Sequence, residues 1–387
     1  MGFDQEHIVM LPFMAQGHLI PFLALANQIQ HRTGFTITIA TTPTNLNAQY
    51  LRSAISSNTL SAQPNNNIHL AELPFPSQDY GLPPNTESTE NLPLNLIGNL
   101  FTASQYLEAP TRRLVSDITK QQGKPPLCLI SDVFFGWAVN VANSSGTVNV
   151  AFSTGGAYGT AAYATIWLHL PHRNRNVSSD DEEFQLPGFP ERLSFETLSP
   201  ASVSKSRGRK KYSVKKSGIS AEKCNEWLDS HASDSVVYIS FGSQNTISAS
   251  QMMELARAGD TVTHPATSAF VSHCGWNSVV ESLSQGVPII GWPLAAEQAY
   301  NSKMLVEEMG VSVELTRGVQ SNVVAEEVRR VIDLVVDESG KGGEMRRRAG
   351  EIKDKIRGAV GEDGEATGSS AKAIDDFVFC SFVTHTS

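Results

Sequence analysis

Apolar and polar positions in the first half of the chain alternate between two patterns. Short apolar runs, rich in β-branched residues, predict strands at 7–13, 35–42, 67–74, 127–132 and 147–154. Apolar residues at helical spacing predict helices at 18–32, over a long region of roughly 89–121, and from about Phe135. Strands separated by helices are typical of a parallel, doubly wound sheet.

The second half repeats this alternation. Strands are predicted at 235–243, 268–275 and 287–293. Helices are predicted at 248–259, 277–286, 296–310, 321–338, 342–359 and 369–383. The fold class is therefore α/β, with two Rossmann-like domains facing each other across a cleft, where open α/β sheets usually bind ligands.

Composition places the domain boundary in a basic segment. Seven basic residues stand between Lys205 and Lys216, with almost nothing to bury. We read a solvated linker, against the alternative of a nuclear-localisation or lipid-binding patch. The predicted division is a Rossmann-like domain at 1–203, the linker at 204–222, a second domain at 223–368, and a helix and tail at 369–387.

Charge and cysteine usage narrow the class of protein. The formal net charge of the 387 residues is −9, which argues against a general nucleic-acid binder. The four cysteines are widely separated without a Cys-x-x-Cys pair, so neither a disulfide framework nor a zinc site is expected. No run approaches the ~20 apolar residues of a membrane span, and no signal peptide is recognised. We expect a cytoplasmic monomer that needs no metal.

The largest group of candidate functional side chains lies in the stretch "HCGWNSVVESLSQGVPIIGWPLAAEQ", which begins at His273. A strand that ends at Gly275 and a helix that starts near Asn277 present backbone N–H groups and a positive dipole end, which together bind anions. His273, Asn277 and Ser278 add side-chain donors there. A diphosphate is the natural ligand.

Purely structural roles explain single residues of this stretch equally well. Ser278 and Glu281 have the spacing of a capping box. His273 alone would more often be a hydrogen-bonded buried histidine, and Trp276 alone a packing residue. His18, beside Gly17 at a helix start, would alone more often be a cap or core residue.

Taken jointly, the stretch resembles the signature motif of plant UDP-sugar-dependent glycosyltransferases of secondary metabolism, a family with the two-domain GT-B fold. The resemblance implies that His273, Gly275, Asn277 and Ser278 lie at the diphosphate. It also implies that Glu281 accepts hydrogen bonds from the ribose. The hexose-facing residues would be Trp276, Glu297 and Gln298. A closing glutamine usually accompanies glucose, which makes UDP-glucose the expected donor substrate.

The N-terminal half resembles the same family. "MLPFMAQGHLIPFLALA" carries the family's catalytic histidine at His18, and "CLISDVFFGWAVNVA" its acidic partner at Asp132. "YISFGS" leads to a phosphate-contacting loop, with Ser243 as the donor. His18 would act as general base on an acceptor hydroxyl, and Asp132 would orient and stabilise the imidazole. The N-terminal domain would bind the acceptor and the C-terminal domain the UDP-sugar.

The sequence departs from the family pattern in two places. The motif should open with Trp-Ala-Pro-Gln, but "LARA" stands at 255–258, and the predicted helix before it runs almost directly into "THPATSAF". At least one strand and a loop of the C-terminal domain are therefore expected to be missing. A second shortfall lies near the basic linker. The resemblance covers roughly 1–200 and 225–380, and we expect weak nucleotide binding and a poorly stable C-terminal half.

Two hypotheses follow, with two weaker ones behind them. The first is an inverting transfer of glucose to a hydroxyl of a small lipophilic acceptor, whose identity would be set by apolar loops at 74–88 and 155–167. The second is a catalytically impaired or dead relative that still binds a ligand. A nicotinamide-dependent oxidoreductase is disfavoured because no Gly-x-Gly-x-x-Gly follows the first strand. A UDP-sugar epimerase is a further, weaker option.

Overall fold

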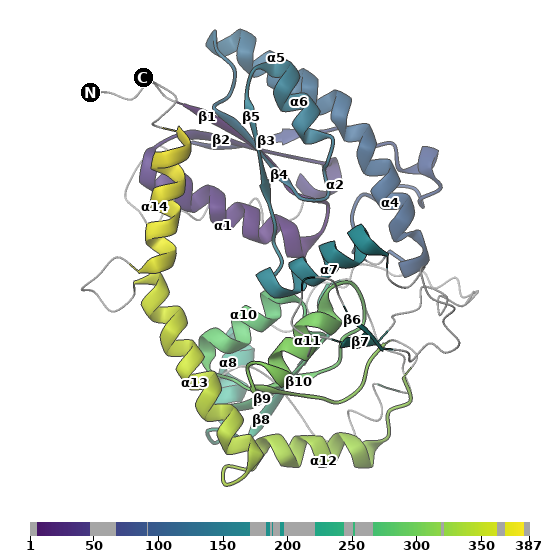
Figure 1. Cartoon of the computed structure of the whole chain (residues 1–387), viewed down its shortest axis with the longest axis vertical. Coiled ribbons are helices and arrows are strands. Elements are labelled where there is room, and N and C mark those ends of the chain that lie inside the picture. The colour runs from purple at the N-terminus through teal and green to yellow at the C-terminus, as the bar shows by residue number, and fades with distance from the viewer. Residues whose placement is uncertain are drawn as a thin grey trace. The chain divides into compact units, whose positions relative to one another are not determined.

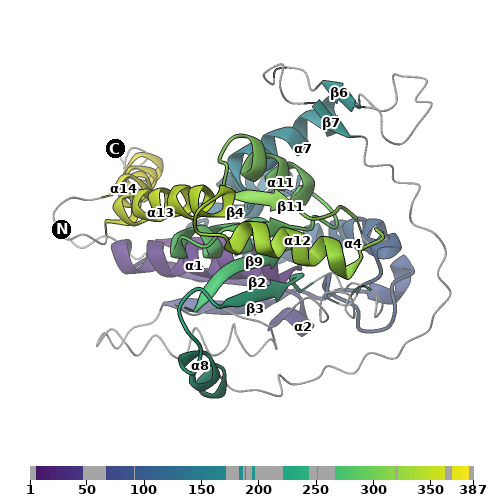
Figure 2. The ribbon, with the colours of Figure 1, turned by 90° about the horizontal axis from the view of Figure 1, so that it is seen from below.

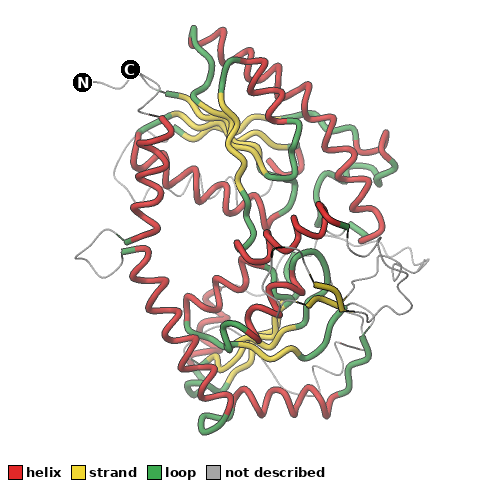
Figure 3. Tube along the Cα trace, in the orientation of Figure 1, coloured by secondary structure: helices red, strands yellow, loops and turns green. Residues whose placement is uncertain are grey.

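The computed structural model describes residues 6–46, 67–90, 92–170, 183–185, 188, 194–196, 221–243, 251, 266–318, 321–361 and 368–382. The chain forms two compact units, which are treated separately below. Unit 1 comprises residues 1–154 and 369–387, and unit 2 comprises residues 155–368. Each is built around a parallel sheet with helices packed against it (Figures 1 and 3).

Unit 1 contains a five-stranded parallel sheet in the order β3-β2-β1-β4-β5. Its strands are β1 (His7–Leu11), β2 (Thr36–Thr41), β3 (Ile68–Glu72), β4 (Cys128–Asp132) and β5 (Val148–Phe152). All five strands were predicted from their apolar runs, and the order is that of a doubly wound sheet. Every residue of β1 and β4 is buried, as expected for central strands covered on both faces.

The helices of unit 1 cover both faces of this sheet. They are α1 (Gln16–Thr33), α2 (Pro43–Leu46), α4 (Ile97–Ser104), α5 (Glu108–Gln122), α6 (Ala138–Ser145) and α14 (Ser369–Phe382). Val9 and Leu11 face one apolar core, while Ile8 and Met10 face the other. The C-terminal helix α14 joins the second core through Val378, and Asp375 forms an ion pair with Arg32 of α1 at 2.8 Å.

The long helical region predicted at roughly 89–121 is confirmed from Leu94 on, and it is divided into the two helices α4 and α5. A 3-10 turn at Gln105–Leu107 separates α4 from α5. The Ser104 hydroxyl donates to the Phe101 carbonyl at 2.7 Å, a local bond of the kind that competes with helix continuation. Pro110 lies in the first turn of α5, where a residue without an N–H is tolerated, so a new helix start is favoured there.

Unit 2 contains a four-stranded parallel sheet in the order β11-β10-β9-β8. Its strands are β8 (Val236–Ser240), β9 (Thr267–Ser272), β10 (Ile289–Gly291) and β11 (Ser312–Glu314). Its helices are α7 (Ala157–His169), α8 (Ala221–Asp229), α10 (Trp276–Gln285), α11 (Gln298–Glu307), α12 (Ala325–Val336) and α13 (Lys341–Val360). Helix α12 lies against the sheet (Figure 2), and its residues Val328, Val331 and Val335 belong to the apolar core of the unit. A hairpin of β6 (Glu183–Gln185) and β7 (Ser194–Glu196) completes the unit.

The two sheets differ beside their first strands. In unit 1, β1 has β2 on one side and β4 on the other, whereas β8 pairs only with β9 within the described part of the chain. The other edge of β8 is thus open within the described residues, and the absence of a strand there stays a prediction. The "LARA" tetrapeptide, most of the helix predicted at 248–259 and the basic linker up to residue 220 lie outside the described residues.

Candidate active and donor-binding sites

Sheet topology brings His18 and Asp132 together. β1 and β4 are parallel neighbours, with Met10 opposite Ile130, so the carboxyl ends of both strands meet at one edge. Asp132 is the last residue of β4, and α1 begins shortly after β1. The strands β2 and β3 lie on one side of β1, and the strands β4 and β5 lie on the other side, so the direction in which strands are added reverses at β1. This switch point is the usual ligand site of such a sheet.

A short hydrogen bond joins the two side chains. His18 Nδ1 lies 2.6 Å from Asp132 Oδ2, and the Asp132 side chain is fully buried. The Phe134 N–H donates to Asp132 Oδ1 at 3.1 Å, so both carboxylate oxygens are engaged. Because a carboxylate only accepts, Nδ1 carries the proton in this bond. The N-cap of α1 is Ala15, so the reading of His18 as a cap is wrong.

Three phenylalanines surround this histidine, and sequence reasoning did not single them out. The Phe13 and Phe134 rings each lie 5.5 Å from the His18 imidazole between centroids. Phe101 stacks on Phe13 at 4.9 Å and meets Phe134 edge-on at 5.0 Å. Phe134 remains 37% exposed, which leaves an apolar aromatic surface beside the imidazole.

In unit 2, the turn from β9 into α10 is held by backbone geometry. Gly275 is the N-cap of α10, with φ −63° and ψ 142° and no side-chain cap bond. Ser278 therefore lies inside the first helical turn, and the capping-box interpretation of Ser278 and Glu281 is wrong. Cys274 takes the left-handed conformation at φ 62°. The amide of Asn301, a residue that sequence reasoning missed, donates to the Cys274 carbonyl at 2.9 Å and fixes the turn.

His273 packs tightly between two glycines. A Cβ at Gly242 would lie 2.7 Å from His273 Nε2, and a Cβ at Gly275 would lie 2.4 Å from the same atom. The Nδ1 atom is buried and has no hydrogen-bond partner in the described part of the chain. Burial lowers the pKa of His273 to about 4, against a smaller opposing effect of the Ser240 backbone.

The lowered pKa of His273 predicts an acid-sensitive unit 2. Between about pH 6.5 and pH 4 the unfolded chain binds a proton at this residue that the native state does not bind. The free energy of unfolding should therefore be greatest above pH 6.5 and fall by about 3 kcal/mol as the pH drops through this window. Urea unfolding at several pH values should show a weaker pH dependence for His273→Gln than for the wild type. Equal slopes would contradict the assignment.

The loop predicted at 155–167 is wrong, because α7 occupies most of it. Gly156 is the N-cap of α7, and a Cβ there would lie 2.6 Å from the Trp276 ring. A Cβ at Gly159 would lie 2.4 Å from Asn301 Oδ1 and 3.4 Å from Glu297 Cγ. Gly156 and Gly159 therefore permit close approach of α7 to Trp276 and to α11.

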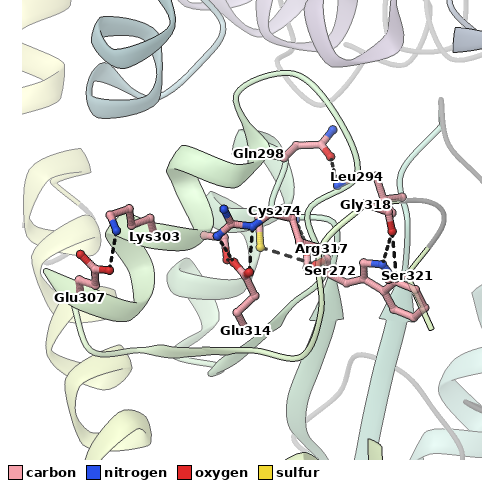
Figure 4. A network of polar contacts seen from close by, with 12 residues as sticks. Ser272, Cys274, Leu294, Gln298, Lys303, Glu307, Glu314, Arg317, Gly318 and Ser321 are labelled. Carbon is pink, nitrogen blue, oxygen red and sulfur yellow. Dashed lines mark hydrogen bonds and ion pairs between the residues drawn. The ribbon is translucent and has the colours of Figure 1, made fainter. Parts of the chain in front are cut away.

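The side-chain oxygen of Gln298 is hydrogen-bonded to the backbone of the loop that precedes α11. Oε1 accepts hydrogen bonds from the Leu294 and Ala295 N–H groups, both at 2.9 Å. Figure 4 shows the Nε2 end directed away from the bond to Leu294. Glu297 is the N-cap of α11. In the same network, Arg317 pairs with Glu314 at 2.9 Å, behind the Cys274 turn.

The structure brings the predicted residues into two groups, one in each unit. His18 and Asp132 form the first. In unit 2, residues 273–278 form the turn from β9 into α10. Gly242 lies close to His273, and Ser243 directly follows Gly242 in the sequence. Glu281 is exposed on α10, one helical turn beyond Asn277. Among the described residues, no cluster of three or more His, Cys, Asp or Glu side chains could hold a metal ion, and no helix has the length and apolarity to span a bilayer.

Comparison with protein families and with known proteins shows to which family the chain belongs. The family model for glycosyltransferase N-terminal domains matches residues 4–230, and the model for UDP-glucoronosyl and UDP-glucosyl transferases matches residues 243–346. The chain is 36% identical to crocetin glucosyltransferase 3 of Crocus sativus, over 93% of this chain and 96% of that protein. It is 32% identical to UDP-glycosyltransferase 92A1 of Arabidopsis thaliana, over 96% of both.

This chain therefore belongs to the plant UDP-glycosyltransferases, enzymes that use a UDP-sugar donor. Its fold is similar to that of Glycyrrhiza uralensis UGT73P12 (TM-score 0.75, 22% identity, 99% of this chain and 97% of that one). It is also similar to Arabidopsis thaliana UGT89C1 (TM-score 0.73, 23% identity, 98% of this chain and 100% of that one). The predicted GT-B fold is confirmed. The alignment with the Crocus protein runs over 478 positions, more than the 387 residues of the chain, so it contains gaps opposite that relative.

Proposed function

We propose that this protein transfers glucose from UDP-glucose to a hydroxyl of a small lipophilic acceptor, with inversion at the anomeric carbon. The observation that carries the proposal is the 2.6 Å bond between His18 Nδ1 and Asp132 Oδ2, which leaves Nε2 as a base. The relative from Crocus is named a glucosyltransferase, which supports the choice of sugar. The exposed part of the Phe134 ring, which packs on Phe13 and Phe101, suits an apolar acceptor.

In this mechanism His18 removes the acceptor proton while the acceptor oxygen attacks the anomeric carbon. The bond from that carbon to the UDP oxygen breaks as the new bond forms, so a single displacement inverts the centre. Asp132 stabilises the imidazolium that results. The negative charge that develops on UDP is held by the N-terminus of α10 together with His273, Asn277 and Ser278.

The remaining predicted residues contact the UDP-sugar. Ser243 donates to a phosphate, and Glu281 accepts from the ribose hydroxyls. Gly275 leaves room for the His273 ring. The hexose contacts Trp276, Glu297 and Gln298. The mechanism needs no metal, because donors of the protein hold the diphosphate.

The proposal is tested by incubating the purified chain with UDP-glucose and a panel of phenolic acceptors. We expect a glucoside by mass spectrometry and one UDP released for each glucoside formed. Folded protein that yields neither product with any acceptor would refute the proposal.

The substitution Gln298→Glu should distinguish the role of the side-chain oxygen of Gln298 from the role of its amide NH2 group. The glutamate keeps an oxygen for the Leu294 and Ala295 N–H groups but loses the amide donor that we assign to the hexose. We expect UDP affinity to change less than about threefold and UDP-glucose affinity to fall by about tenfold, the effect of one lost hydrogen bond at the upper end of its usual range. Calorimetry with both ligands measures this. Equal losses for UDP and UDP-glucose would show that Gln298 acts only on the loop.

A relative with impaired catalysis that still binds ligand is the second candidate. The gaps against the Crocus protein and the open edge of β8 favour it. UDP binding without glucoside formation would identify this case, and turnover that His18→Ala abolishes would exclude it.

Location and assembly are also proposed. We expect a cytoplasmic monomer that binds a UDP-sugar and a small acceptor. Light scattering of the purified chain and imaging of a fluorescent fusion in plant cells test these two points, and a dimeric mass or a fusion confined to an organelle would contradict them.

A further inference from the structure

A third side chain reaches the nitrogen that links His18 to Asp132. Thr154 Oγ1 lies 3.1 Å from His18 Nδ1. β4 and β5 pair in parallel, with Asp132 opposite Phe152, so residue 154 follows the strand end next to the histidine. The sequence analysis did not single out this threonine.

The chemistry of Nδ1 decides what Thr154 can do there. Asp132 Oδ2 accepts at 2.6 Å, so Nδ1 carries the hydrogen. Thr154 Oγ1 then accepts the second branch of the same N–H in a three-centre bond. The two acceptors come from different strand ends and hold the imidazole from two directions. The Phe13 and Phe134 rings pack beside the imidazole, and the second acceptor adds a polar restraint on its tilt about the bond to Asp132.

We propose that Thr154 is a positioning residue that, together with Asp132, keeps Nδ1 protonated and fixes the direction of the basic Nε2 of His18. The inference rests on the proposed role of His18 as general base. A base a few tenths of an ångström out of line loses rate without losing substrate affinity, because proton transfer depends on hydrogen-bond geometry in the transition state. The effect should therefore appear in kcat.

Two substitutions separate the oxygen of Thr154 from its shape. Thr154→Val keeps the branched side chain and removes the oxygen, and Thr154→Ser keeps the oxygen. We expect kcat for glucoside formation to fall about fivefold in the valine variant, the usual effect of one hydrogen bond. The KM for UDP-glucose should change less than about twofold. The serine variant should restore most of the rate.

Controls show whether the effect acts through His18. Thr119→Val removes a hydroxyl that donates to the Val115 carbonyl within α5, and it should leave kcat unchanged. Gly156, two residues after Thr154, packs on Trp276, so UDP affinity must be measured in each variant. A loss in UDP affinity that matches the loss in kcat would overturn the positioning role. A serine variant as slow as the valine variant would also overturn it.

A readout without turnover separates this inference from the proposed function. Nitrogen-15 spectra of the imidazoles, with the His18 signal identified by its loss in His18→Gln, report which ring nitrogen carries the proton. We expect a single Nδ1–H form in the wild type and in Thr154→Ser, and a mixed or broadened signal in Thr154→Val. An unchanged signal in the valine variant would refute the inference. If the wild type makes no glucoside, the proposed function fails, and these spectra still decide the role of Thr154.

Discussion

Replacing His18 by alanine is expected to lower kcat for glucoside formation by about 1,000-fold. The acceptor hydroxyl is a poor nucleophile, and a positioned general base contributes about 100- to 10,000-fold. UDP affinity should stay the same, because the nucleotide is assigned to residues of unit 2. Initial rates with saturating UDP-glucose, together with UDP calorimetry, measure both quantities.

Matched variants define this effect. His31→Ala changes an exposed histidine of the same helix and should retain the wild-type rate. Asp132→Asn should lower kcat by about 100-fold or more, because an amide can donate to Nδ1 and so move the proton to Nε2. A His18→Ala enzyme that keeps more than a tenth of the rate would remove His18 from the mechanism.

Gly275→Ala is expected to weaken UDP binding by about 100-fold. The backbone at Gly275, with φ −63° and ψ 142°, is open to any residue, so alanine introduces no backbone strain. Its Cβ would instead lie 2.4 Å from His273 Nε2 and force the imidazole out of its position. Loss of a hydrogen bond to a charged group, with distortion of the N–H groups beside it, accounts for a change of this size. Calorimetry with UDP measures it.

Gly358→Ala is the matched control for this substitution. Gly358 lies within α13, and nothing lies within 4 Å of a Cβ built on it. Alanine there should raise the free energy of unfolding by about 1 kcal/mol and leave UDP affinity unchanged. UDP affinity that stays within threefold of the wild type in Gly275→Ala would show that the His273 ring does not contribute to nucleotide binding.

Most elements of the fold could be predicted because each one carries its own pattern. β1 and β4 are fully buried apolar runs, and α12 has an apolar face over an exposed polar one. The three-residue strand β11 was missed because so short a run has no resolvable period. Its strand character depends on the pairing of Val313 with Ile290.

The errors in the prediction also have local causes. The segment 155–167 was predicted as a loop, yet two of its glycines permit contacts of a helix with Trp276 and Asn301, which lie far away in sequence. The prediction of one helical region at 89–121 did not separate α4 from α5, which are joined by a 3-10 turn at Gln105–Leu107. The capping box failed because the N-cap of α10 is Gly275, three residues before Ser278.

The sequence by itself determined the class of fold, the strand and helix succession, and the residue types of both sites, because these depend on local periodicity and on a specific motif. Only the tertiary structure decided which side chains meet. His18 and Asp132 are 114 positions apart, and the pairing of β1 with β4 brings them into contact. The approach of Thr154 to the same nitrogen and the fit of His273 between two glycines likewise depend on strand register and on packing distances of a few ångströms, which no local pattern encodes.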